Sequence, residues 1–135
     1  MDAPLAATSL ADFWGRRWNR AYRQVSHVAF FHPCVRQFGL TAGTLAAFGI
    51  SGVVHDLVIS IPAGGGYGGP TIYFLVQGLS RLLEKLAPVA GFLRRQPWYG
   101  WCWTAAVVVG PVGLLFHRPS LTNVINPFLV AIGAR

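Results

Sequence analysis

Apolar runs of membrane length dominate the chain. The longest extends from Leu40 to Ile61, and His55 and Asp56 are its only ionisable residues. A helix of about 20 residues crosses the hydrocarbon core of a bilayer, so this run predicts a transmembrane span. Two further runs and a shorter final piece predict spans over 71–87 and 99–116 and a partial or tilted helix over 121–133.

The segment before the first span alternates aromatic and basic positions. Ser9, three residues before Asp12, has the form of a capping box and predicts a helix that begins near Leu10. Aromatic side chains then fall on one helical face and arginines on another, a pattern typical of a helix lying in the headgroup layer. Pro33 interrupts the next apolar stretch, so residues 9–38 are predicted to form interfacial or re-entrant helices.

Small residues mark both the first span and the loop after it. Within residues 40–61 they predict close approach by a neighbouring helix. The uncharged loop 62–70 contains five glycines but no Gly-Lys-Ser/Thr, so it predicts a reversal between spans rather than a phosphate loop. Residues 1–135 are therefore expected to form a single all-α integral membrane bundle, with about three or four spans preceded by an amphipathic interfacial helix.

The composition supports a membrane setting. Hydrophobic residues make up 53% of the chain and charged residues only 11%, whereas soluble domains carry about 25% charged residues. The formal net charge of +7 does not indicate nucleic-acid binding, because the basic clusters are separated by apolar spans. Basic residues gather before residue 40 and within 81–95, which predicts that the amino terminus and the 81–97 linker face the cytoplasm.

The cysteines and most histidines suggest no metal or disulfide chemistry. Cys34 and Cys102 lie far apart, so we expect free thiols. His27 and His32 match no zinc spacing, and His117, at a span end, is expected to be structural. No metal site is predicted.

His55 is the candidate for chemistry. Charges in a span are costly, but a desolvated imidazole remains neutral and can accept a proton as a general base. Asp56 lies about 100° around the helix, so contact between the two cannot be assumed. From position alone, hydrogen bonding across a helix bundle explains His55 equally well, and the aromatic and basic helix could be only an interfacial anchor.

Two stretches read together resemble a known family. SLADFWGRRWNRAYR, followed by SGVVHDLVIS, resembles the membrane-bound O-acyltransferase family, most closely its wax-synthase-like branch. The matching positions are Phe13, Trp14, Trp18, Asn19 and His55, and the last two are 36 positions apart. The stretch PVGLLFHRPSLTNVINPFL also looks like the carboxy-terminal end of that branch.

The resemblance implies transfer of a fatty acyl group from acyl-CoA to a hydroxyl acceptor, such as a long-chain alcohol, within the membrane. It implies that His55 is the base and that Asn19 stabilises the oxyanion or orients the reactants. Asp56 stands where the family commonly has Glu, and a supporting role for it is open. Acyl-CoA is expected as co-substrate, with no other cofactor. The residues expected to bind it are Arg16, Arg17, Arg20, Arg23, Trp14 and Trp18.

The size of the chain leaves alternatives open. The family's chamber uses roughly twice as many spans, so the chain resembles the carboxy-terminal part of such an enzyme and is expected to need an amino-terminal half or an oligomeric partner. One alternative is a noncatalytic membrane subunit or a degenerate acyltransferase fragment. Another is a small cationic protein that binds anionic lipid through its arginine helix.

Overall fold

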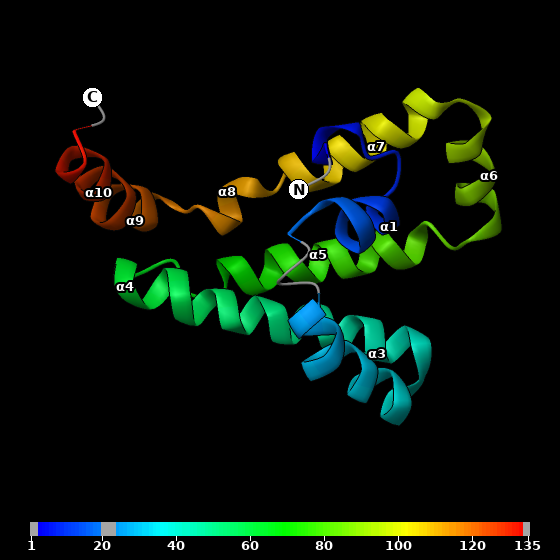
Figure 1. The fold of residues 1–135 in the computed structure, drawn as a ribbon, viewed down its shortest axis with the longest axis horizontal. Coiled ribbons are helices and arrows are strands. Elements are labelled where there is room, and N and C mark those ends of the chain that lie inside the picture. The colour runs from blue at the N-terminus through cyan, green and yellow to red at the C-terminus, as the bar shows by residue number, and fades with distance from the viewer. Residues whose placement is uncertain (1–2, 20–23, 134–135) are drawn as a thin grey trace.

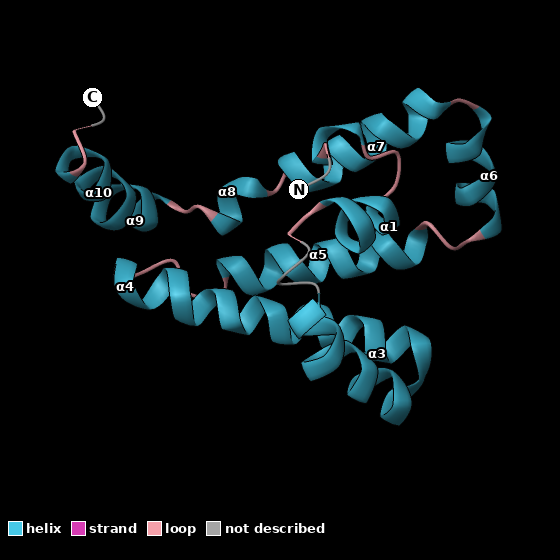
Figure 2. Ribbon diagram, viewed as in Figure 1, coloured by secondary structure: helices cyan, strands magenta, loops and turns pink. Residues whose placement is uncertain are grey.

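The computed structural model describes residues 3–19 and 24–133, and this part of the chain is helical with no strand (Figures 1 and 2). The predicted all-α class is therefore confirmed. The elements are η1 (Pro4–Ala6), α1 (Leu10–Asp12), η2 (Phe13–Arg17), η3 (His27–Phe31), α3 (His32–His55), η4 (Asp56–Ser60), α4 (Ile61–Ala63), α5 (Gly69–Leu83), α6 (Ala87–Arg95), α7 (Pro97–Val109), α8 (Val112–Leu115), α9 (Arg118–Ser120), η5 (Leu121–Ile125) and α10 (Asn126–Ala131).

An antiparallel pair of helices forms the centre of the fold. After α3 and α4 the chain reverses through the glycine loop, and α5 runs back along α3 (Figure 1). The other face of α5 contacts α1, α7 and α8. The predicted reversal at 62–70 is thus confirmed, and α5 is the element on which the surrounding helices pack.

Glycines permit the close contact between these helices. A Cβ placed on Gly52 would lie 2.7 Å from the Cα of Thr71, and one on Gly78 would lie 3.1 Å from the Cβ of Phe48. By contrast, a Cβ on Gly49 would meet Leu75 at 3.7 Å, an ordinary van der Waals distance. Of these three glycines, Gly52 therefore lies closest to the backbone of the facing helix.

The helix before the first predicted span is broken at Gly39 and not at Pro33. Gly39 has φ 77° and ψ 173°, a conformation that only glycine adopts readily. Pro33 lies inside a helix that already runs from Gln24 through the π-helical turn η3, and the chain stays helical through it. The predicted break exists, but the residue assigned to it was wrong. Residues 24–38 fold back against the rest of α3.

The amino-terminal helix is shorter than predicted. The Ser9 hydroxyl accepts the Asp12 amide at 3.0 Å, so the predicted cap is confirmed. The helix ends after Arg17, because Trp18 is extended and Asn19 has φ 26°. The helix with aromatic and arginine faces is therefore interrupted earlier than predicted, and Arg20 and Arg23 lie outside the described residues.

Two helices in the described ranges are long and apolar enough to cross a membrane. They are Gln24–Ala63, which includes the break at Gly39, and Pro97–Leu115. These correspond to the predicted spans 40–61 and 99–116. Helix α5 has 15 residues, which at about 1.5 Å per residue gives a length below the roughly 30 Å of the hydrocarbon core.

A break between α7 and α8 is repaired by side chains of α5. Pro111 has no N–H to donate to the carbonyl of Val107, four residues earlier. The buried Gln77 amide nitrogen donates to that carbonyl at 2.8 Å, while its oxygen accepts Trp14 Nε1 at 3.2 Å. The Tyr73 hydroxyl donates to Val108 O at 3.1 Å. Neighbouring side chains thus satisfy carbonyls near a helix break in an apolar bundle.

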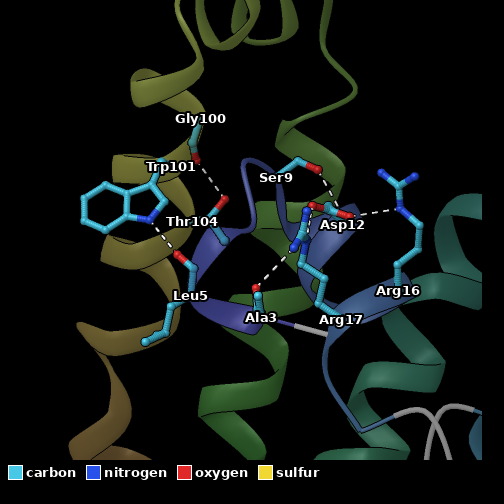
Figure 3. Close-up of polar contacts among 9 residues, drawn as sticks. All are labelled: Ala3, Leu5, Ser9, Asp12, Arg16, Arg17, Gly100, Trp101 and Thr104. Carbon is cyan, nitrogen blue, oxygen red and sulfur yellow. Dashed lines mark hydrogen bonds and ion pairs between the residues drawn. The ribbon is translucent and has the colours of Figure 1, made fainter. Parts of the chain in front are cut away.

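The residues before α1 are held against α7 (Figure 3). Trp101 Nε1 donates to the Leu5 carbonyl at 2.7 Å. A Cβ on Gly100 would lie 2.2 Å from the Thr8 carbonyl oxygen, so this position accepts no larger residue without a shift. Trp101 and the close approach at Gly100 therefore hold residues 5–8 against α7.

Replacing Gly52 with Ala tests the contact between α3 and α5. The added methyl group has no space against Thr71, so Gly52→Ala should lower the free energy of unfolding by about 1–3 kcal/mol. Gly49→Ala on the same helix is the matched control and should have little effect. The measurement is unfolding in detergent micelles, and equal effects of the two substitutions would contradict the helix register.

Replacing Gln77 with Ala tests the repair of the α7 break. It leaves Val107 O and Trp14 Nε1 without their Gln77 partner, so stability should fall by about 1–3 kcal/mol. Gln37→Ala, at an exposed position of α3, is the control. Thermal unfolding followed by near-ultraviolet circular dichroism measures both, and a Gln77 variant as stable as the control would refute this role.

Candidate active site

A cavity of about 690 Å³ lies between the amino-terminal helix, the folded-back segment 24–31, α3 and α5. Its volume falls within the usual range for small-molecule sites, about 300–1,000 Å³. Much of its lining is aromatic or aliphatic, and Asn19, Ser51, Arg81 and Lys85 are among its polar or charged residues. The site therefore combines an apolar body with cations toward the far end of α5.

Three residues selected from the sequence meet at this cavity. Asn19, Trp14 and Trp18 all line it. The Trp18 ring stacks on Phe13 with centroids 5.5 Å apart, and the Trp14 ring lies 5.7 Å from that of Phe74 on α5. The left-handed backbone of Asn19 ends the helix and sets the chain direction at the cavity. Packing of aromatic rings thus fixes this part of the wall.

His55 lies one helical turn beyond the cavity wall. Its Nδ1 is 2.7 Å from the carbonyl oxygen of Ser51, a residue that lines the cavity. A carbonyl can only accept, so this contact places the ring proton on Nδ1 and leaves Nε2 as the basic nitrogen. The imidazole packs on Phe74 with centroids 4.3 Å apart. His55 itself is not among the residues that line the cavity, whereas its ring partner Phe74 is.

The arginines of the amino-terminal helix converge on one carboxylate (Figure 3). The Nε atoms of Arg16 and Arg17 lie 2.9 Å and 2.6 Å from the two oxygens of Asp12. Arg17 also donates to the Ala3 carbonyl at 3.2 Å. Arg17 thus ties the residues before the helix to it, whereas Arg16 makes an i,i+4 pair within the helix. Their predicted contact with acyl-CoA stays a prediction.

Asp56 binds the start of α5. Its Oδ1 accepts Gly68 N at 2.9 Å and the Ser60 hydroxyl at 2.8 Å, and its Oδ2 accepts the amide and hydroxyl of Thr71. The first amides of a helix have no partner within the helix, and a carboxylate satisfies them and the helix dipole together. The supporting role toward His55 stays a prediction.

Ser60 and His117 resemble a nucleophile and its base, but their protons are placed differently. The Ser60 oxygen lies 3.2 Å from His117 Nε2, and His117 Nδ1 accepts the Ser120 amide at 3.3 Å. Because Nδ1 is the acceptor, Nε2 carries the ring proton and donates to Ser60, whose own proton goes to Asp56. This arrangement cannot activate the hydroxyl. It supports the structural role expected for His117.

The comparison with known proteins decides the family. The sequence model of a protein family, described as "Membrane bound O-acyl transferase family", matches residues 1–77, more than half of the chain. The chain belongs to the membrane-bound O-acyltransferase family. The matched range contains Asn19, His55 and Asp56.

Plant proteins are among the relatives of this O-acyltransferase family member. Probable long-chain-alcohol O-fatty-acyltransferase 7 of Arabidopsis thaliana is 33% identical over 136 residues, covering 89% of this chain and 39% of the relative. Probable long-chain-alcohol O-fatty-acyltransferase 3 of the same plant is 32% identical, covering 68% and 30%. Its acyl-CoA–sterol O-acyltransferase 1 is 39% identical, covering 41% and 18%. No solved structure matches the chain.

No residue of α5 was predicted to belong to this site, although Phe74 and Arg81 line the cavity. Phe74, Gln77 and Arg81 recur at i, i+3 and i+7, a spacing that puts them on one helical face. Two of them line the cavity, and Gln77 holds the ring of Trp14. This spacing of one aromatic, one polar and one charged residue on a helical face was the feature of the sequence that could have indicated that α5 contributes to the site.

Replacing Asp56 with Asn tests whether this carboxylate holds the start of α5 in place. An amide keeps the size but loses the charge and one acceptor oxygen, so Asp56→Asn should cost about 1–3 kcal/mol of stability. Asp12→Asn, at a carboxylate outside the α3–α5 turn, should leave that turn in place. The readout is protease cleavage within 62–68 in micelles, and unchanged protection in Asp56→Asn would refute the clamp.

Proposed function

We propose that this chain takes part in membrane O-acyl transfer, moving a fatty acyl group from acyl-CoA to a hydroxyl acceptor such as a long-chain alcohol. The observation that carries the proposal is the cavity at which Asn19 and the Ser51–Phe74 wall meet, with the His55 imidazole packed behind Phe74. Membership of the family and the names of its plant relatives support the same reaction. The chain spans about two fifths of the length of the first of these relatives.

In this proposal His55 is the general base. Nε2 removes the hydroxyl proton as the alcohol oxygen attacks the thioester carbonyl, and the Ser51 carbonyl holds Nδ1–H in place. The Asn19 amide donates to the developing oxyanion. The intermediate collapses as the C–S bond breaks, the coenzyme A sulfur receives the proton from the imidazolium, and the products are an ester and free coenzyme A.

The proposed orientation puts the acyl donor on the cytosolic side. The basic residues before residue 40 and within 81–95 support a cytoplasmic amino terminus and a cytoplasmic 81–97 linker. We place the two long apolar helices across the bilayer, with α5 partly inserted between them. The lipid alcohol then enters laterally from the membrane, and a long apolar chain fits the aromatic lining of the cavity.

His55→Ala tests the proposal, with His32→Ala as the matched control at the other end of α3. Membranes containing the chain are supplied with labelled fatty acyl-CoA and a long-chain alcohol, and the ester is quantified by thin-layer chromatography. His55→Ala should reduce the rate about 100-fold or more, while His32→Ala keeps it. Asn19→Ala should reduce it by about 10²–10³ through the loss of one oxyanion donor.

The controls also address the noncatalytic alternative. Each variant is checked for membrane insertion and for the unfolding temperature in micelles. Ester formation that is equal in His55→Ala and in the unchanged chain, with normal insertion of both, would contradict catalysis by His55. It would favour a noncatalytic membrane subunit.

A further inference from the structure

A second cavity adjoins the first across α5. It has a volume of about 640 Å³ and is lined by the ends of α5 and α6 and the residues before α1. Ala11, Arg81 and Lys85 line both cavities. The same two cations therefore lie where an aromatic, apolar space meets a more polar one.

The lining of the second cavity is rich in cations. Arg94 joins Arg81 and Lys85 there, and Glu84 is the acidic residue among them. The Glu84 carboxylate accepts Leu10 N at 2.7 Å and Ala11 N at 3.4 Å, so it serves as the cap of the amino-terminal helix. Three cations thus face one carboxylate that is already hydrogen-bonded.

The ion pair between Glu84 and Arg81 is long. Arg81 Nη1 lies 3.9 Å from Glu84 Oε2, at the outer limit of an ion pair, and the Arg81 side chain is 27% exposed. Partial desolvation lowers the pKa of the Lys85 ammonium, and the neighbouring Arg81 cation lowers it further. A bound anion would relieve this repulsion. By contrast, the Nε atoms of Arg16 and Arg17 lie within 3 Å of the Asp12 carboxylate oxygens.

We propose that Arg81, Lys85 and Arg94 form a phosphate-binding site that holds the coenzyme A portion of the acyl donor, while its acyl chain lies in the adjoining aromatic cavity. This inference rests on the proposed function and assigns its polar half to residues outside the amino-terminal helix. Guanidinium groups bind phosphate oxygens in bidentate fashion, and an ammonium adds a point charge. A ligand with an apolar chain and a polyanionic end matches two cavities joined at two cations.

Binding of free coenzyme A tests the site without requiring acyl transfer. The chain is placed in nanodiscs of uncharged phosphatidylcholine and titrated calorimetrically with coenzyme A and with pantetheine, which lacks the phosphates. Arg81→Gln and Lys85→Gln should each weaken coenzyme A binding by about 10-fold and leave pantetheine binding unchanged. Arg36→Gln, an exposed arginine of α3 that lines neither cavity, is the control.

Other outcomes would overturn the site. Loss of coenzyme A binding in Arg16→Gln but not in Arg81→Gln would show that the amino-terminal helix, and not this site, binds the phosphates. Equal loss of coenzyme A and pantetheine binding would show that Arg81 shapes the cavity without binding phosphate. If Arg81→Gln left coenzyme A binding unchanged and altered only the interaction of the chain with anionic phosphatidylglycerol in the nanodisc, the ligand would be a lipid headgroup. Weakened binding of coenzyme A in a chain that transfers no acyl group would support this site and contradict only the proposed function.

Discussion

The carboxylate of Asp56 fixes the start of α5, and the candidate active site depends on that contact. It accepts hydrogen bonds from Ser60, Gly68 and Thr71, so one side chain ties the end of the first long helix to the loop and to the next helix. An unpaired carboxylate at this depth would be costly. With four donors it becomes the point from which α5 runs back along α3.

The return of α5 determines what surrounds the catalytic candidates. Phe74 packs on His55 and lines the cavity, and Gln77 holds Trp14 and repairs the break before α8. Arg81 then lies where the two cavities meet. A shift of one residue along α5 would rotate every one of these side chains by about 100°. The close contact at Gly52 opposes such a shift.

Much of the fold could be predicted because hydropathy and capping are local signals. The runs 40–61 and 99–116, the cap at Ser9 and the glycine reversal all follow from residues close in sequence. The break at Gly39 could not be separated from one at Pro33, since both residues interrupt helices. The contacts of Asp56 with Thr71 and of Gln77 with Val107 depend on which helices meet. Asn19 and His55 could therefore be selected from the sequence, whereas the α5 residue that contacts His55 and lines the cavity, Phe74, was not.

The register of α3 against α5 is measured most directly by cysteine cross-linking. In a background with Cys34→Ser and Cys102→Ser, Phe48→Cys is paired with Gly78→Cys, whose Cβ would lie 3.1 Å from the Phe48 Cβ. Disulfides span about 3.5–4.5 Å between Cβ atoms, so this pair needs to separate by only a few tenths of an ångström and should form a disulfide rapidly in membranes. The Phe48→Cys and Leu82→Cys pair, one turn further on, should remain reduced. Preferential cross-linking of the second pair would contradict the helix arrangement on which the site is built.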